Sequence, residues 1–182
     1  MVPEGNKWYT TSWRTVPEHQ GGFVLDGGVH SSAAFRLLLG ADAAPETVLA
    51  LSAQVQEHLP PLDTIHALVT TKSGAIGTFS ISQGTTLPGY QYAVACADGS
   101  VVVAGNAVTV TRGTGKAPQD DRREFPETSG VKELVKAWAA GLATGKPDPL
   151  QSPERALGDL ELLEKIFRSG EKGGAPERLE LQ

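Results

Sequence analysis

Two side chains in the stretch QGGFVLDGGVH (residues 20–30) have the chemistry of an acid–base pair, the carboxylate of Asp26 and the imidazole of His30. Residues four apart on a helix lie on the same face, with Cβ atoms roughly 5–6 Å apart. An imidazole changes its protonation state near neutral pH, so it can take a proton from a hydroxyl group or return one. The spacing predicts that both residues act on one small molecule, although such a pair alone is more often a surface contact.

Glycine is unusually frequent around this pair. Gly21, Gly22, Gly27 and Gly28 fall within eight positions that otherwise have the pattern of a helix. A glycine inside a helix costs roughly 0.5–1 kcal/mol relative to alanine, so this stretch gives up local stability. We interpret the missing side chains as a surface on which a flat ligand approaches the backbone, which makes Gly22 and Gly28 candidate cofactor contacts.

Two residues upstream of the glycines are candidates for binding a substrate. Trp13 and Arg14 precede the acid–base pair and would line a pocket beside it, with the Arg14 guanidinium clamping a carboxylate or a hydroxyl. The alternative is that both belong to an N-terminal arm, residues 1–20, that packs on the domain surface. The residue types favour neither reading.

The composition is that of a globular protein and excludes several kinds of partner. Hydrophobic residues make up 40% of the 182 residues, and the net charge of −5 opposes the phosphate backbone of nucleic acids. The sequence shows neither an apolar stretch of about 20 residues nor a signal peptide. The single cysteine, Cys96, allows no intrachain disulfide, which indicates a reducing compartment. We therefore expect a cytoplasmic protein that binds no nucleic acid, no membrane and no metal.

The length of 182 residues predicts a single domain, 1–182. After the irregular N-terminal arm, hydrophobic periodicity predicts helices and antiparallel strands, an α+β arrangement. Residues 22–39 have helical spacing and end at Gly40, a common helix stop. The middle of the chain is rich in Val, Ile and Thr, and turns at Asp98–Gly99 and Gly105–Asn106 predict antiparallel hairpins. The predicted strands are 46–56, 64–72, 75–83, 90–97, 100–104 and 107–112.

The last part of the chain returns to helical spacing. Residues 129–145 and 152–170 each carry an apolar stripe, and we expect both helices to cover one face of the sheet. Residues 171–182 form a frayed tail or a short closing strand. The opposite face of the sheet is then open, either to solvent or to a second subunit.

The residues Gly21, Gly22, Asp26, Gly28 and His30 match, without a gap, the GGxxxDxGxH signature of the Gfo/Idh/MocA oxidoreductases. The neighbouring residues resemble fungal members, and the final PERALGDLELLEKIFRSGEKG resembles the end of the family's C-terminal domain. The resemblance covers essentially the whole chain. It implies a glyceraldehyde-3-phosphate dehydrogenase-like C-terminal domain, with a large open, mostly antiparallel sheet, helices on one face, and frequent oligomerisation, such as a homodimer, through the other.

The resemblance also implies an activity. In the family this domain binds a small-molecule substrate beside a nicotinamide ring, so NAD or NADP is the implied cofactor. The signature histidine handles the proton of the oxidised hydroxyl and the signature aspartate orients the substrate, roles that fall on His30 and Asp26. The implied substrate is a sugar, a cyclitol or a secondary metabolite.

The sequence departs from the family where the nucleotide would bind. We expect this chain to lack the Gly-rich phosphate loop and the Glu-Lys-Pro motif of the family's N-terminal half, because its Lys146–Pro147 follows Gly145. Three functions stay open: the substrate half of an NAD(P)-dependent oxidoreductase, either truncated or served by a separate cofactor domain; a cofactor-independent isomerase, cyclase or lyase that reuses the pocket; and a non-catalytic dimerisation or binding module.

Overall fold

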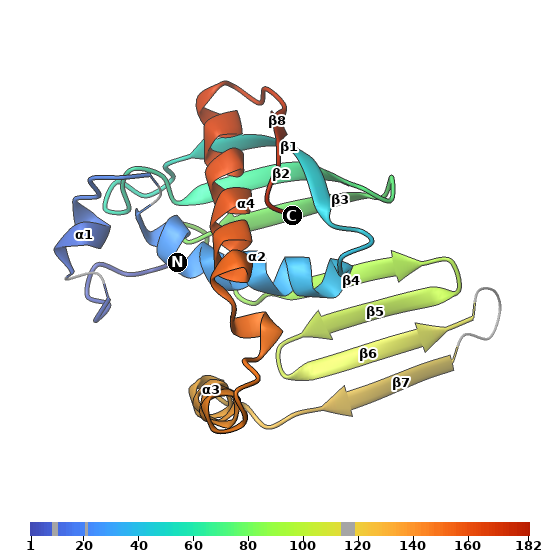
Figure 1. Ribbon diagram of the computed structural model, residues 1–182. Helices are drawn as coiled ribbons and strands as arrows, with labels where there is room; N and C mark the ends of the chain where they lie inside the picture. Colours follow the sequence, from blue (N-terminus) through green and yellow to red (C-terminus); the bar gives the residue numbers. More distant parts are fainter. Residues whose placement is uncertain (9–10, 21, 114–118) are drawn as a thin grey trace. The chain divides into compact units, whose positions relative to one another are not determined.

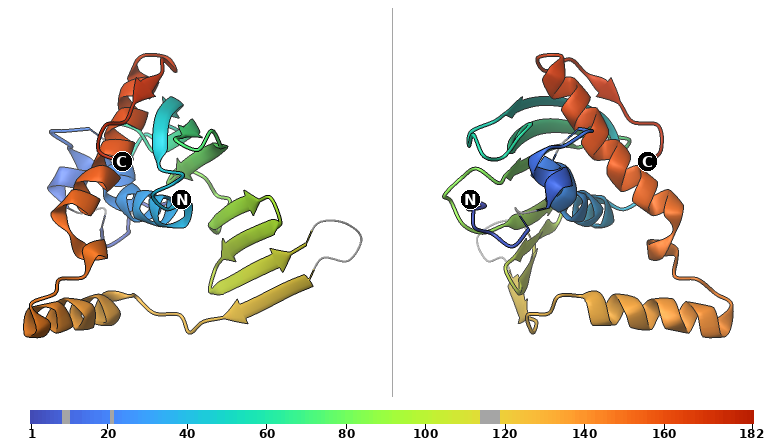
Figure 2. Two further views of the ribbon diagram at one scale, coloured as in Figure 1. Left: turned by 45° about the vertical axis from the view of Figure 1, so that its right-hand side comes forward. Right: turned by 90° about the vertical axis from the view of Figure 1, so that its left-hand side faces the viewer.

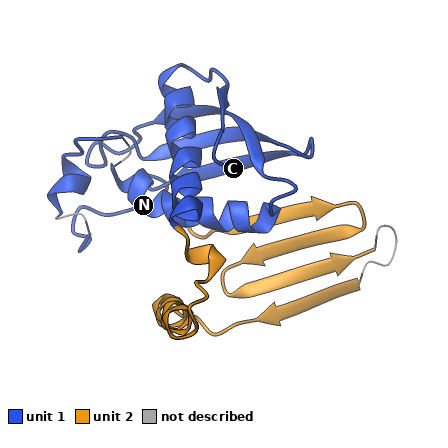
Figure 3. Ribbon diagram, viewed as in Figure 1, with its two compact units in different colours: residues 1–87, 153–182 blue, residues 88–152 orange. Residues whose placement is uncertain are grey.

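The computed structural model describes residues 1–8, 11–20, 22–113 and 119–182, which form two compact units (Figure 3). Unit 1 combines residues 1–87 with residues 153–182, and unit 2 is the intervening segment 88–152. Each unit contains one four-stranded antiparallel sheet. The predicted α+β class with antiparallel strands is confirmed, and the strands are shared between two sheets.

Unit 1 is a layer of helices packed on one face of its sheet, whose strand order is β3-β2-β1-β8. Both long helices lie on the same side of this sheet in all views (Figures 1 and 2). The elements are the single helical turn α1 (Ser12–Thr15), the helices α2 (Gly22–Leu39) and α4 (Pro153–Glu171), and the strands β1 (Pro45–Ala53), β2 (Thr64–Thr71), β3 (Ile76–Ser82) and β8 (Glu177–Arg178).

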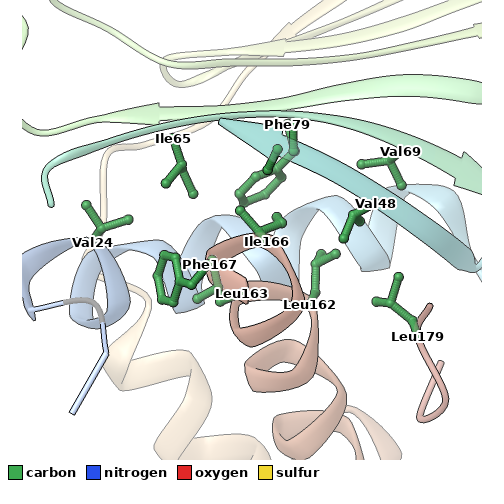
Figure 4. Close-up of a cluster of buried hydrophobic side chains, with 12 residues drawn as sticks. Val24, Val48, Ile65, Val69, Phe79, Leu162, Leu163, Ile166, Phe167 and Leu179 are labelled. Atoms are coloured by element: carbon green, nitrogen blue, oxygen red, sulfur yellow. The ribbon is translucent and has the colours of Figure 1, made fainter. Parts of the chain in front are cut away.

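The core of unit 1 lies between this sheet face and the two helices. Alternate residues of β2 are buried, as expected when one face of an antiparallel strand is covered. Figure 4 shows Val24 of α2 and a set of α4 side chains directed at the strands. This packing fixes α2, the helix that carries Asp26 and His30, against the rest of the unit. The core side chains include Val24, Val48, Ile65, Val69, Phe79, Leu162, Leu163, Ile166, Phe167 and Leu179.

The C-terminal segment belongs to this core. The buried carboxylate of Glu161 accepts the backbone N–H groups of Glu180 at 2.6 Å and of Leu181 at 2.8 Å. Strand β8 pairs with β1, so of the two alternatives for this segment, a frayed tail or a short closing strand, the structure has the strand. A hydrogen bond from Lys172 holds the pKa of the Glu177 carboxyl in β8 below its usual value. The tail is therefore anchored at several points.

Unit 2 consists of an antiparallel meander followed by a helix. Consecutive strands are neighbours in the sheet, in the order β4-β5-β6-β7. Because side chains alternate between faces along each strand, the register places one set of valines on a common face. The elements are β4 (Gln91–Cys96), β5 (Gly99–Ala104), β6 (Ala107–Arg112), β7 (Gln119–Glu124), the helix α3 (Val131–Thr144) and the 3-10 turn η1 (Pro149–Gln151).

Two hairpin turns of this meander were predicted from the sequence, and one of them lies where it was predicted. The turn between β5 and β6 is Gly105–Asn106 as predicted, and Gly105 has φ +58°. The turn between β4 and β5 is Ala97–Asp98, one residue earlier than predicted. Gly99 instead starts β5, where a side chain would overlap the carbonyl of Thr111 on the neighbouring strand.

Strand β7 is absent from the sequence prediction. Its residues, QDDRRE, are all polar, so no hydrophobic alternation indicates a strand. It lies at the edge of the sheet, where charged side chains are common. The hydrogen bond from Arg123 holds the pKa of the neighbouring Asp121 carboxyl below its usual value.

Helix α3 has the predicted apolar stripe, but no residue of the helix is buried. Its large apolar side chains are each at least 50% exposed, in contrast to those of α4 that fill the core of unit 1. The exposed side chains of α3 are Val131, Leu134, Val135, Trp138 and Leu142.

Among the residues that the structure describes, no helix has the length and apolar character needed to cross a membrane.

Candidate functional site

Helix α2 places the two candidate catalytic residues. It spans Gly22–Leu39, as predicted, so Asp26 and His30 lie about one helical turn apart on the same face. The side chain of Asp26 is 37% exposed, and His30 is exposed to solvent. Because His30 is accessible, its imidazole can exchange a proton with a small molecule without any movement of the helix.

The Asp26 carboxylate is paired with Arg14, a partner that sequence reasoning missed. Arg14 lies in the short helix α1 and is only 8% exposed. Its Nε and Nη2 atoms lie 2.8 and 2.7 Å from Asp26 Oδ2. Such a charge-assisted hydrogen bond is stronger than one between neutral groups, particularly where the cation is shielded from water. The pair ties the N-terminal arm to the start of α2.

Aromatic rings cover the Arg14 guanidinium. The carbon at its centre lies 3.9 Å from the centroid of the Trp13 ring and 5.5 Å from that of the Trp8 ring. These distances are within the range of cation–π attraction. Arg14 Nη1 also donates a hydrogen bond to Thr11 Oγ1 at 2.7 Å. Both indoles remain about half exposed, at 52%. Trp13 contacts Arg14, and its role in substrate binding stays a prediction.

The glycines of α2 have packing reasons in the structure. Gly22 has φ +41°, and a side chain there would overlap the carbonyl of Pro60. A Cβ at Gly28 would lie 3.2 Å from Ile81 Cδ1 and 3.3 Å from Leu163 Cδ2, closer than ordinary contact. The missing side chains thus let α2 approach β3 and α4. The cofactor contacts suggested for Gly22 and Gly28 remain predictions, and Gly21 lies outside the described residues.

A buried carboxylate supports the loop against which α2 begins. Asp63 is fully buried and accepts the backbone N–H groups of Val55 at 3.0 Å and Gln56 at 2.6 Å, and the hydroxyl of Thr64 at 2.8 Å. These bonds close the loop between β1 and β2, whose Pro60 lies against Gly22 at the start of α2. Sequence reasoning missed Asp63, because an aspartate after two prolines resembles an ordinary surface turn.

A shallow pocket of about 400 Å³ lies elsewhere in unit 1, beside α4. It reaches Leu25 of α2, but its lining includes neither Asp26 nor His30. We give more weight to the residues of α2 as the candidate site, because two of the three carboxylates in the pocket lining are engaged: Glu161 binds the tail and Glu164 pairs with Arg168 at 2.6 Å.

The described residues do not fit a complete nicotinamide dinucleotide. Dinucleotides bind at the ends of parallel strands, where a glycine-rich turn leads into a helix. Every strand pair in the two described sheets is antiparallel. Across the same residues, no three His, Cys, Asp or Glu side chains gather into a metal site.

The sequence matches a known family over almost its full length. The family described as "Oxidoreductase family, C-terminal alpha/beta domain" matches residues 2–178. Dehydrogenase FPY6 of Fusarium mangiferae is 37% identical over 178 residues, which cover 96% of this chain and 51% of that protein. The chain thus spans about half the length of the curated relatives it matches.

Solved structures share the fold. An oxidoreductase from Thermotoga maritima is similar with a TM-score of 0.79 and 28% identity, covering 97% of this chain and 50% of that one. A levoglucosan dehydrogenase in complex with NADH and levoglucosan has a TM-score of 0.75 at 14% identity, covering 92% of this chain and 53% of that one. At such low identity the second likeness shows the fold alone.

Proposed function

Since the chain belongs to the Gfo/Idh/MocA oxidoreductase family, as its C-terminal alpha/beta domain, we propose that it is the substrate-binding and catalytic half of an NAD(P)-dependent dehydrogenase. The substrate class is a hydroxylated small molecule such as a sugar or cyclitol. The levoglucosan dehydrogenase of the same fold, which binds NADH and a sugar derivative, supports this class. The observation that carries the proposal is the exposed His30, one turn from an ionic Asp26–Arg14 pair on α2.

The proposal gives each residue a separate task. Oxidation of an alcohol to a carbonyl removes the hydroxyl proton and a hydride from the carbon. The neutral imidazole of His30 takes the proton, and Asp26 accepts a hydrogen bond that orients the substrate. Since the described residues do not fit the dinucleotide, we assign them the proton and the orientation of the substrate only. The hydride acceptor belongs to a part of the enzyme outside these residues.

Sugar binding to the chain tests this proposal. Levoglucosan, glucose and myo-inositol are each titrated into the ¹⁵N-labelled protein and followed by NMR. We expect at least one to shift the signals of α2 and the Trp13 indole, and His30→Ala to weaken its binding about tenfold, since a hydrogen-bonding partner is lost. His66→Ala, which removes another exposed histidine of unit 1, is the matched control.

Two outcomes would contradict the proposal. The first is that none of the three probes shifts α2 at concentrations up to its solubility. The second is that the shifts are confined to the pocket beside α4. A parallel titration with NADH tests the assignment of the dinucleotide, because micromolar affinity of this chain alone would show that it carries a nucleotide site.

The proposal includes pairing of two copies through the sheet of unit 2. Val101 pairs with Val94 and Val110 on its neighbouring strands, so one sheet face is apolar across β4, β5 and β6. Val102 lies on the other face beside Ala93 and Thr109. An apolar face of this kind is typical of a subunit interface.

Sedimentation velocity tests this interface. We expect Val101→Lys to weaken self-association at least tenfold, because the lysine would bury a charge between the two copies. Val102→Lys should leave self-association unchanged. A monomeric wild-type protein, or equal effects of both lysines, would exclude this interface.

A further inference from the structure

The ion pair between Arg14 and Asp26 occupies only one of the two carboxylate oxygens. Nε and Nη2 of Arg14 both approach Oδ2 of Asp26, at 2.8 and 2.7 Å. Within the described part of the chain, Oδ1 accepts no hydrogen bond, and the side chain is 37% exposed. Oδ1 is therefore an acceptor that a ligand can reach, on a carboxylate that cannot rotate freely.

We infer that Arg14 is a positioning residue, which holds Oδ2 of Asp26 so that Oδ1 accepts a hydrogen bond from a substrate hydroxyl. The inference rests on the proposed function and deepens it, since it assigns hydroxyl recognition to one atom. Arg14 itself does not bind the substrate, because the residue is only 8% exposed and its guanidinium is covered by indole rings. This role differs from the substrate clamp that the sequence suggests for Arg14.

The surroundings of Arg14 require a guanidinium in particular. A guanidinium is planar, so it can stack on the Trp13 ring while Nε donates a hydrogen bond to Asp26 Oδ2 and Nη2 forms an ion pair with the same oxygen. A third N–H reaches Thr11 Oγ1 at 2.7 Å, which fixes the rotation of the group. The ammonium of a lysine keeps the charge but can satisfy neither the stack nor this fork. Arg14→Lys is therefore an informative variant, because it separates charge from geometry.

A double-mutant cycle tests the inference, with the tightest-binding sugar of the panel as the probe. We expect Asp26→Ala and Arg14→Lys each to weaken its binding about tenfold, since a hydrogen bond to a charged group is lost or misplaced. The double variant is expected to bind no more weakly than Asp26→Ala alone, because Arg14 acts through that carboxylate. Arg178→Lys, at an exposed position of the same unit, is the control. Circular dichroism checks that each variant is folded.

Each outcome decides one of the two proposals. Wild-type protein that binds no sugar overturns the proposed function, and with it this inference. If the wild type binds sugar and the two effects in the cycle are additive, Arg14 contacts the substrate directly. If Arg14→Lys has unchanged affinity, Arg14 does not position Asp26. Either result overturns this inference and leaves the proposed function standing. The pairing of Arg14 with Asp26 can also be tested without any sugar. The Arg14 Nε–H signal should be observable by ¹⁵N NMR at neutral pH in the wild type and lost in Asp26→Ala, and its persistence there would contradict the pairing.

Discussion

Under the proposed function, replacing His30 with alanine is expected to lower kcat by about 100- to 10,000-fold, the usual contribution of a general acid or base, when the chain is assayed with a dinucleotide-binding domain. The reason is that the proposed function assigns the substrate proton to His30, which is exposed on α2. The rate of NAD(P)H formation with a sugar substrate measures the effect. Thermal stability should be nearly unchanged, because an exposed side chain contributes little to the core.

Control variants separate the chemistry from other roles of His30. His66→Ala should keep the wild-type rate, and His30→Asn, which retains a polar group but no titratable nitrogen, should be as slow as His30→Ala. An unchanged rate in His30→Ala would leave the chain a binding or dimerisation module. A reaction that needs no dinucleotide and is lost in the same variant would instead support an isomerase, cyclase or lyase.

Replacing Asp63 with alanine should lower the free energy of unfolding by about 3 kcal/mol, as expected when several hydrogen bonds to a buried charge are removed together. The carboxylate is fully buried and serves the N–H groups of Val55 and Gln56 and the hydroxyl of Thr64. Without it these donors lose their acceptor. Urea denaturation followed by circular dichroism measures the change.

Two further variants sharpen this test. Asp63→Asn keeps the shape but places an amide NH₂ where two N–H donors converge, so we expect a loss between that of alanine and zero. Asp42→Ala, at an exposed aspartate of the same unit, should change stability by less than about 0.5 kcal/mol. A loss below about 1 kcal/mol in Asp63→Ala would show that water replaces the carboxylate and that the loop does not depend on it.

Elements with strong periodicity could be predicted from the sequence. Helix α2 agrees with the prediction at both ends, because its apolar spacing stops at Gly40, which has φ +70°. Strand β7 could not be predicted, since a fully polar edge strand lacks any hydrophobic alternation. The turn before Gly99 was misplaced because the requirement for glycine comes from the adjacent strand, which local sequence does not reveal.

The candidate site was predictable in its residue types but only partly in its contacts. The spacing of Asp26 and His30 determines their common face, because both lie on one helix. The contact between Arg14 and Asp26 spans a twelve-residue separation across an irregular segment, so no periodicity relates the two. The role of Gly28 likewise depends on how closely α2 packs on β3 and α4, which is a property of the tertiary fold.

The interrupted course of unit 1 has a consequence for how this protein is made. Its sheet is built mainly from β1, β2 and β3, whereas the side chains that cover the sheet come largely from α4, after all of unit 2. During synthesis on the ribosome, these strands emerge long before Leu162, Leu163, Ile166 and Phe167. The apolar face of these strands therefore stays uncovered until α4 has been synthesised. Exposed apolar surface of this kind favours aggregation and binding by chaperones.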